Sequence, residues 1–262
     1  KYAAENPYQY LSQEEAKKKL LELYGTKSAG SPSILVNNRP NVVIVILESF
    51  TGSLVESLGG EKGVAPGMEK LIDQGVFFDR IYSSGDRTDR GVVSVLSGFP
   101  AQATRSIMKQ NDKQEKLPAI ASTLFAAGYS NSFLYGGESE FFNMKSYLIS
   151  HKYENLIDRR SFEAKDMNSK WGAYDHVVFQ KFLSEIRNVK EPFFSTILTL
   201  TNHEPFELPG KHRFGDDTNE NKFRSTAFYT DSVLFDFLDR SRSEPWYKNT
   251  LFVIVADHGH RL

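Results

Sequence analysis

The chain has 262 residues, of which 40% are hydrophobic and 25% are charged, and this composition excludes a disordered or fibrous protein. Its formal net charge is −1, and lysine and arginine are spread along the chain, so the sequence gives no sign of a nucleic-acid-binding surface. Because the chain has no cysteine, disulfides, thiolate metal sites and cysteine nucleophiles are excluded, while the redox compartment stays open.

The N-terminal part of the chain predicts a helix followed by a linker. Ser12 with Glu15 three residues later is a capping-box pattern, which marks the start of a helix. The small residues of TKSAGSPS, 26–33, then predict a linker. We therefore divide the chain into a helix and linker, residues 1–33, and a single domain, residues 34–262.

From residue 34 onward, apolar runs alternate with helical patterns, which is typical of βαβ units on a mainly parallel sheet. The predicted strands are Asn41–Leu47, Val76–Tyr82, Tyr129–Tyr135, Phe193–Leu200 and Thr250–Val255. The predicted helices are Gly67–Gln74, Asp89–Leu96, Pro118–Ala127, Glu140–Ser150, Tyr174–Asn188 and Lys222–Arg240. We expect a three-layer α/β/α domain with a mainly parallel central sheet, in which the last strand is buried on both faces.

Polar residues follow several of the predicted strands. Glu48 follows the first strand, and Thr88 begins a helix after the second. His203 follows the strand at Phe193, and Asp257 and His258 follow the last strand. Because ligands bind outside the carboxyl ends of the strands in open α/β sheets, we expect these side chains to meet at one edge.

This set of residue types suits metal-assisted attack on an ester. Carboxylates, a hydroxyl and one imidazole suit a hard or borderline divalent cation. A threonine hydroxyl held by such a cation loses its proton more readily and becomes a nucleophile. Thr88 would also lie at a helix N-terminus, where backbone N–H groups receive anions. The pattern therefore indicates attack on a phosphoryl or sulfuryl ester.

Each residue taken alone also has an ordinary structural explanation. Glu48 could be a solvated turn residue, Thr88 a helix cap, and His203 a turn histidine. The pair Asp257 and His258 is harder to explain in this way, because polar groups beside a buried strand are costly without partners. The order and placement of all these residues together carry the interpretation. The remaining histidines, His151, His176, His212 and His260, are expected to be surface or supporting residues.

In chain order, the segments NVVIVILES, SSGDRTDRGVVSVLSGFP, LTLTNHEPF, FRSTAFYTDSVLFDFL and VIVADHG resemble the sulfatase domain of the alkaline phosphatase superfamily. Within it, they are most similar to the lipoteichoic acid synthase and phosphoglycerol transferase branch. The likeness covers about residues 40–260 and implies an alkaline phosphatase-like fold. Since domains of that family continue past the DHG motif, this domain is expected to be truncated at its C-terminus.

The resemblance also implies roles for these residues. One divalent ion, manganese, magnesium or zinc, would be bound by Glu48, Thr88, Asp257 and His258. Thr88 would be the nucleophile that carries a covalent phosphoryl group. His203 matches a histidine that contacts the phosphoryl group or its leaving group, and Arg87 matches a basic residue that could neutralise the anion.

The headgroup pocket departs from the resemblance. Lipoteichoic acid synthases have H-G-D-N-x-x-F-W-N-R after the middle strand, where this chain reads YGGESEFFNM. Tyr135 stands at the histidine, Gly137 at the aspartate and Met144 at the arginine, so we expect a rebuilt pocket. Phe142, at the tryptophan position, and Asn143, which matches, are expected to bind substrate together with the phosphoryl-contacting histidine.

True sulfatases carry a cysteine or serine that is oxidised to formylglycine, and Thr88 stands at that position here. We therefore expect transfer or hydrolysis of a phospholipid-type or polymer headgroup phosphoester through a phospho-threonine. The expected location is the extracytoplasmic face of a bacterial cell membrane. No apolar run approaches the roughly 20 residues of a membrane-spanning helix, so a segment outside this chain would provide the anchor. Two alternatives stay open: a hydrolase of soluble phosphate or sulfate esters, and a catalytically silent domain that binds a polymer or partner.

Overall fold

The computed structural model describes residues 9–25, 35–102, 105–168 and 170–260. By its internal contacts, the chain divides into two compact units, Lys1–Asn38 and Arg39–Leu262. The predicted linker, residues 26–33, lies outside the described residues.

The first unit contains helix α1, Gln13–Tyr24. The predicted capping box is confirmed, because Ser12 Oγ accepts the N–H of Glu15 at 3.2 Å and the Glu15 carboxylate accepts the N–H of Ser12 at 2.9 Å. No helix in the described part of the chain combines the length and the apolar character that crossing a bilayer requires.

The second unit is built on a five-stranded parallel sheet with the order β3-β2-β4-β1-β5. The strands are β1 Asn41–Leu47, β2 Ser130–Tyr135, β3 Asn155–Ile157, β4 Phe193–Leu198 and β5 Thr250–Ala256. The expectation of a parallel α/β sheet is confirmed, although β3 was not predicted. A strand of three residues is too short to show a pattern in the sequence.

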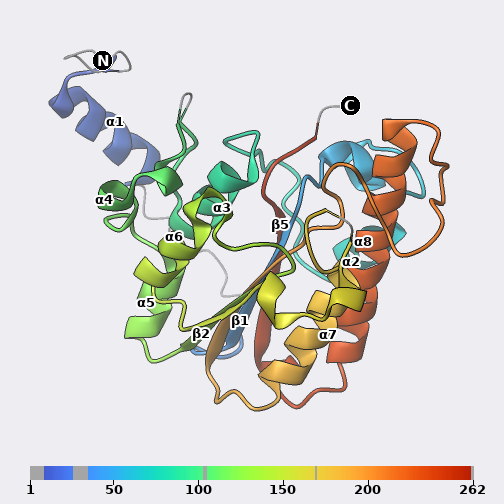
Figure 1. The fold of residues 1–262 in the computed structure, drawn as a ribbon. Coiled ribbons are helices and arrows are strands. Elements are labelled where there is room, and N and C mark those ends of the chain that lie inside the picture. The colour runs from blue at the N-terminus through green and yellow to red at the C-terminus, as the bar shows by residue number, and fades with distance from the viewer. Residues whose placement is uncertain (1–8, 26–34, 103–104, 169, 261–262) are drawn as a thin grey trace. The chain divides into compact units, whose positions relative to one another are not determined.

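Helices cover both faces of this sheet, with α3, α5 and α6 on one side and α2, α7 and α8 on the other (Figure 1). The α-helices of the second unit are α2 Pro66–Ile72, α3 Thr88–Ser97, α4 Asn111–Gln114, α5 Ile120–Ala126, α6 Met144–Ser150, α7 Asp175–Ile186 and α8 Asn219–Ser241. Short 3₁₀ helices lie at Gly52–Leu54, Glu56–Leu58, Ile107–Lys109, Phe141–Asn143, Arg159–Ser161, Ala164–Asp166 and Tyr247–Asn249.

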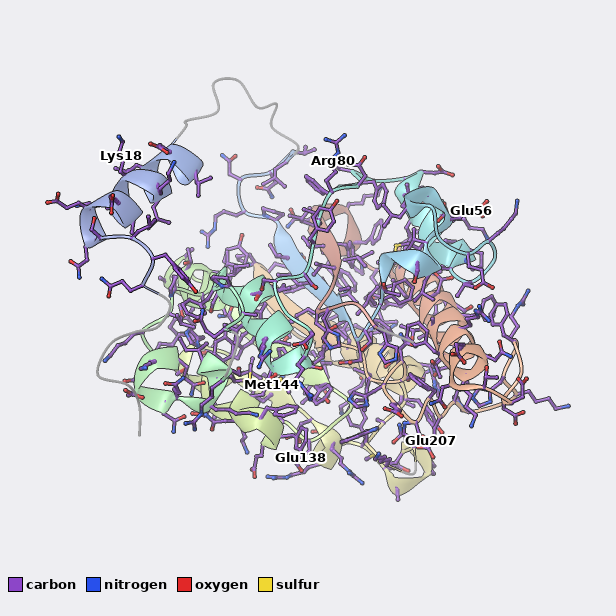
Figure 2. All side chains as sticks on the ribbon, turned by 90° about the horizontal axis from the view of Figure 1, so that it is seen from above. Lys18, Glu56, Arg80, Glu138, Met144 and Glu207 are labelled. Atoms are coloured by element: carbon purple, nitrogen blue, oxygen red, sulfur yellow. The ribbon has the colours of Figure 1, made fainter. Side chains whose placement is uncertain are left out.

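Two hydrophobic cores, one on each face of the sheet, hold the three layers together. Val43 and Val45 of β1 pack in the core with α7 and α8, whereas Ile44 and Ile46 pack in the core with α3 and α6. Because alternate side chains of a strand point to opposite faces, one unbroken apolar run serves both cores. Figure 2 shows the charged side chains of Glu56 and Arg80 at the periphery.

Two predicted strands differ from the structure. Residues 76–82 form no strand, and their apolar side chains are largely exposed, with Val76 at 66% and Phe78 at 67%. The prediction was wrong because this apolar segment has no neighbouring strand to pair with in the described part of the chain. Strand β5 was expected to be buried on both faces, but it is half-buried, and Val253 is exposed. Its only sheet partner among the described residues is β1, so it is an edge strand.

The helix predicted over Glu140–Ser150 is interrupted. Phe142 and Asn143 have φ values of 58° and 68°, in the left-handed region, and α6 begins only at Met144. Left-handed residues cannot continue an α-helix, so the segment turns sharply before α6. This turn determines which side chains face the carboxyl edge of the sheet.

Candidate functional site

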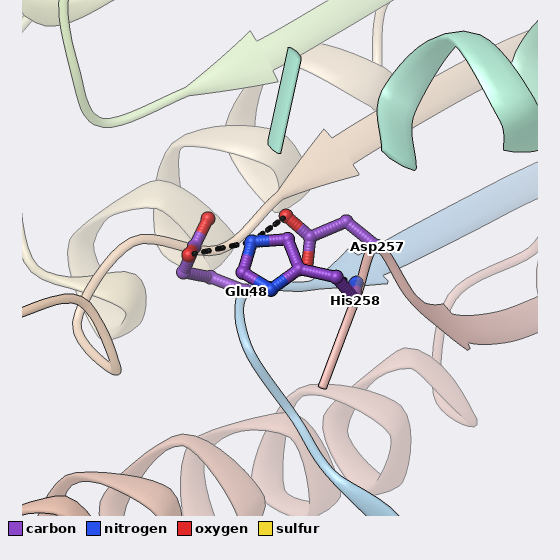
Figure 3. Close-up of side chains that lie close together, drawn as sticks. All are labelled: Glu48, Asp257 and His258. Carbon is purple, nitrogen blue, oxygen red and sulfur yellow. Dashed lines mark hydrogen bonds and ion pairs between the residues drawn. The ribbon is translucent and has the colours of Figure 1, made fainter. Parts of the chain in front are cut away.

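Three buried titratable side chains meet where β1 and β5 end. Glu48 follows β1, and Asp257 and His258 follow β5, and the three side chains point toward one another (Figure 3). His258 Nε2 lies 3.7 Å from Glu48 Oε1 and 3.5 Å from Asp257 Oδ2. One ligand atom from each residue falls within 4.8 Å of the others. The parallel register, which pairs Leu47 with Ala256, is what brings the two loops together.

The hydrogen bonds around this cluster leave one possible ligand atom of Asp257 and one of His258 directed toward the centre of the cluster. Asp257 Oδ1 accepts the N–H groups of Ser49 at 2.9 Å and His258 at 2.7 Å, while Oδ2 is buried without a partner. His258 Nδ1 lies 2.8 Å from the carbonyl oxygen of Gly259, and a carbonyl can only accept, so Nδ1 donates. Nε2 is then the ring nitrogen that faces the two carboxylates.

The electrostatics of the cluster favour a bound cation. Burial, and then the negative charge of Glu48, raise the pKa of Asp257 well above its usual value. Two buried carboxylates and an imidazole lone pair repel one another unless a proton or a metal ion lies between them. The unpartnered Oδ2 of Asp257 and the mixed oxygen and nitrogen donors fit a divalent metal ion.

Thr88 joins this cluster from α3, of which it is the first residue. Its Oγ1 donates to Glu48 Oε2 at 3.0 Å and lies 3.5 Å from His258 Nε2. The structure therefore brings together all four residues that the resemblance gave as metal ligands.

A glycine that the sequence analysis missed allows this approach. A Cβ added to Gly91 would lie 2.3 Å from the carbonyl oxygen of Asp257, which is far inside van der Waals contact. The first turn of α3 can lie against the end of β5 only because position 91 has no side chain. A glycine inside a predicted helix, where it costs about 1 kcal/mol relative to alanine, was the available signal.

The backbone of Glu48 is held by residues after β4 and on α8. Thr199 Oγ1 accepts the N–H of Glu48 at 2.9 Å, and Asn202 Nδ2 donates to its carbonyl oxygen at 3.2 Å. Thr226 in turn donates to Asn202 Oδ1 at 2.7 Å. Ser49, at φ 54°, donates its hydroxyl to Glu48 Oε1 at 2.8 Å. These contacts fix the carboxylate before any ligand binds.

A cleft lined by Thr88 and His203 opens beside the cluster. The His203 ring lies 4.6 Å from that of Trp171, and Trp171 Nε1 donates to the carbonyl oxygen of Glu204 at 2.6 Å. The same carbonyl lies 2.9 Å from His203 Nδ1, so Nδ1 donates and Nε2 stays available. Trp171 thus orients His203. The contact could not be predicted from the sequence, because the two residues lie far apart along the chain.

The other predicted substrate-binding residues lie in different places. Phe142 lines the cleft, and its left-handed backbone turns the ring toward it. Asn143 instead donates its amide to the Met108 carbonyl oxygen at 2.8 Å and to Asn111 Oδ1 at 2.6 Å, and it does not line the cleft. Arg87 is exposed and does not line it either. A larger cavity of about 190 Å³ between α7 and α8 shares no lining residue with the cleft.

Comparison with known proteins places this site in a family. A sequence model of the family described as Sulfatase matches residues 40–262. Lipoteichoic acid synthase 1 of Bacillus subtilis is 28% identical over 234 residues, which cover 83% of this chain and 36% of that protein. The chain thus spans about a third of the length of the curated relatives that it matches.

Solved structures share the fold. A protein of the alkaline phosphatase superfamily from Vibrio parahaemolyticus is 27% identical, with a TM-score of 0.84 over 96% of this chain and 65% of its own. The lipoteichoic acid synthase LtaP of Listeria monocytogenes is 18% identical, with a TM-score of 0.81 over 93% of this chain and 62% of its own. The C-terminal periplasmic domain of EcEptC from Escherichia coli, in complex with Zn, is 18% identical, with a TM-score of 0.66 over 86% of this chain and 65% of its own. Together they confirm the alkaline phosphatase-like fold.

Proposed function

Since the chain belongs to the sulfatase family of the alkaline phosphatase superfamily and is a distant homologue of lipoteichoic acid synthases, we propose that it transfers or hydrolyses a phosphoester headgroup. Thr88 would be the nucleophile. One observation carries the proposal. Thr88 Oγ1 lies 3.0 Å from Glu48 and 3.5 Å from His258, within a buried cluster that also holds Asp257.

The four residues Glu48, Thr88, Asp257 and His258 would hold one divalent ion, manganese, magnesium or zinc. When bound, the ion supplies Lewis acidity, which lowers the pKa of the threonine hydroxyl and offsets negative charge on the phosphoryl group. The hydroxyl proton of Thr88 points at Glu48 Oε2, which gives the proton a place to go as the oxygen attacks. Zinc in EcEptC supports a metal-dependent proposal for this chain.

The reaction would proceed in two displacements at phosphorus. Thr88 Oγ1 forms a bond to phosphorus as the bond to the leaving oxygen breaks, and an alcohol departs. An acceptor alcohol or water then attacks the phospho-threonine and releases Thr88. The N-terminus of α3, which begins at Thr88, directs the positive end of the helix dipole toward the phosphoryl group in both steps.

His203 would protonate the leaving oxygen. Its Nδ1 is occupied by the Glu204 carbonyl, so Nε2 is the nitrogen that can hold the transferable proton. Because His203 and Thr88 line the same cleft, an ester bound there can contact both. In the second displacement the same nitrogen would accept a proton from the attacking alcohol or water.

The chemistry favours a phosphoester over a sulfate ester. Threonine at position 88 cannot be converted to formylglycine, and the chain has no cysteine. The similarity to lipoteichoic acid synthases, and to the periplasmic domain of EcEptC, supports a lipid or polymer headgroup substrate outside the cytoplasm. A soluble-ester hydrolase and a silent binding domain are the alternatives that the following experiment separates.

The test compares the purified protein with Thr88→Ala and with Thr123→Ala, a control whose hydroxyl bonds within α5 to the Ala119 carbonyl. Metal content is measured together with turnover of phosphodiester, phosphomonoester and sulfate ester substrates. We expect at least about a 1,000-fold loss of phosphodiester turnover for Thr88→Ala, and no loss for Thr123→Ala. A preference for the sulfate ester, or full activity of Thr88→Ala, would contradict the proposal. Bound metal without turnover of any ester would favour the silent domain.

A further inference from the structure

One polar group in the cleft has no role in the proposed reaction. Tyr135 is the last residue of β2, and its side chain lines the cleft together with Thr88 and His203. Its hydroxyl forms no hydrogen bond within the part of the chain that the structure describes. The side chain is half-buried, and its hydroxyl oxygen is not among the fully buried polar atoms that lack a partner, so it is open to solvent or to a ligand. An unpartnered phenol beside the reacting threonine is therefore a candidate ligand contact.

Other tyrosines near this sheet show the usual alternative. The hydroxyl of Tyr129 donates to the Pro40 carbonyl oxygen at 2.9 Å, and that of Tyr153 lies 2.7 Å from Thr196 Oγ1. Both hydroxyls are thus used within the protein. Tyr135 ends the strand that begins just after Tyr129, but its hydroxyl has no such partner among the described residues, and its side chain lines the cleft.

Gly137, two residues after Tyr135, leaves space for the tyrosine ring. A Cβ added to Gly137 would lie 2.5 Å from Cζ of Tyr135 and 2.7 Å from its hydroxyl oxygen. The ring therefore lies directly against the Cα atom of Gly137, and any larger residue at 137 would displace it. This contact fixes where the hydroxyl points.

The surrounding charges determine what the phenol can do. Glu48 and Asp257 are close enough for their negative charges, after burial, to raise the pKa of Tyr135. A tyrosine phenol keeps its proton at neutral pH even at its ordinary pKa of about 10, so it can act as a neutral hydrogen-bond donor. A neutral donor suits this place. The carboxylates of Glu48 and Asp257 would repel an anionic side chain, and a cationic side chain would compete with a metal ion for them.

We propose that the Tyr135 hydroxyl donates a hydrogen bond to a nonbridging oxygen of the phosphoryl group that Thr88 attacks, which makes Tyr135 a substrate-binding residue of this site. The inference rests on the proposed function. As the oxygen of Thr88 approaches phosphorus, negative charge on the nonbridging oxygens must be stabilised, and a fixed donor does so without reorganisation. No covalent change of the tyrosine is involved.

The test uses Tyr135→Phe, which removes one oxygen and keeps the ring against Gly137. The matched control is Tyr129→Phe, at the residue that precedes the same strand. Turnover of bis-p-nitrophenyl phosphate by the metal-loaded protein is measured together with metal affinity and the affinity for inorganic phosphate. We expect Tyr135→Phe to lower kcat/KM by about 100-fold and to weaken phosphate binding by about 10-fold. Metal affinity should stay within about twofold, and Tyr129→Phe should behave as the unchanged protein.

Two results would overturn the inference: unchanged kcat/KM and phosphate affinity in Tyr135→Phe, or a parallel fall in metal affinity, which would assign the phenol to the metal site. If the unchanged protein turns over no ester, the proposed function fails, and the phosphate-binding measurement still decides the role of Tyr135. Gly137→Ala provides a second variant, because it keeps the phenol but displaces it. It should reproduce the loss, and normal activity with an added Cβ would contradict the geometry.

Discussion

The buried cluster of Glu48, Asp257 and His258 lies beside the aromatic cleft, and the two are built in different ways. Glu48 and Asp257 come directly after paired parallel strands. Backbone N–H groups hold the carboxylate of Asp257, and the Ser49 hydroxyl holds that of Glu48. In the cleft, Phe142 depends on a left-handed turn, and His203 depends on Trp171 from a distant loop. The sheet therefore fixes the groups that we propose to react, while loops shape the cleft that we propose to hold the substrate. This division predicts that changes in the two regions affect different measured quantities.

The largest effect is expected where the cluster loses a charge. Asp257→Asn removes the carboxylate that faces Glu48 and His258, so we expect metal affinity to fall by at least about 100-fold and turnover to be lost with it. Isothermal titration with manganese and zinc measures the change. Asp236→Asn is the control, since Asp236 is exposed and pairs with Arg240 at 3.6 Å on the surface of α8. Equal metal affinity in both variants would rule out Asp257 as a ligand.

A smaller but still large effect is expected when α3 is moved away from the cluster. In Gly91→Ala the new Cβ would collide with the carbonyl oxygen of Asp257, and Thr88 must shift with the helix. A displacement of about 1 Å costs roughly 100-fold in turnover. Gly75→Ala is the control, because its added Cβ would meet its nearest atom at an ordinary 3.5 Å. A fully active Gly91→Ala would show that the close contact does not position the nucleophile.

The cleft is expected to give the smallest and most selective effect. Trp171→Phe removes the N–H that bonds to the Glu204 carbonyl oxygen and so loosens His203. For a substrate with a poorly departing alcohol we expect kcat to fall by about 10-fold, because such a leaving group needs a proton. With p-nitrophenolate as leaving group the loss should be slight, and metal affinity should not change. An equal loss on both substrates would mean that Trp171 acts on binding or folding instead.

The sequence predicted the elements whose own residues carry the pattern. The bounds predicted for β1, Asn41–Leu47, agree with the structure because a doubly buried parallel strand is an unbroken apolar run. The same pattern gave a wrong prediction at β5. This strand is only half-buried, because burial also depends on the neighbouring strands and helices. At residues 76–82 apolar side chains alone did not produce a strand, because a strand needs a neighbouring strand to pair with, and the segment's own residues do not show one.

The candidate site shows the same limit. Glu48 and Thr88 could be predicted because each follows a recognisable element and has a residue type with specific chemistry. Gly91 and Trp171 could not, because their roles arise from contacts between segments far apart in the chain. Asn143, predicted to bind substrate, donates its amide to other protein groups, since the turn before α6 rotates it away from the cleft.

The covalent role of Thr88 is the central claim, and mass spectrometry of a quenched reaction tests it most directly. The metal-loaded protein and a His203→Ala variant are mixed with bis-p-nitrophenyl phosphate, stopped with acid and digested. Because p-nitrophenolate leaves without a proton, the variant should slow the second displacement more than the first. We predict a phosphorylated peptide modified at Thr88, more abundant in the variant. Continued turnover with no modification at Thr88, or with the phosphoryl group on another residue, would contradict the account.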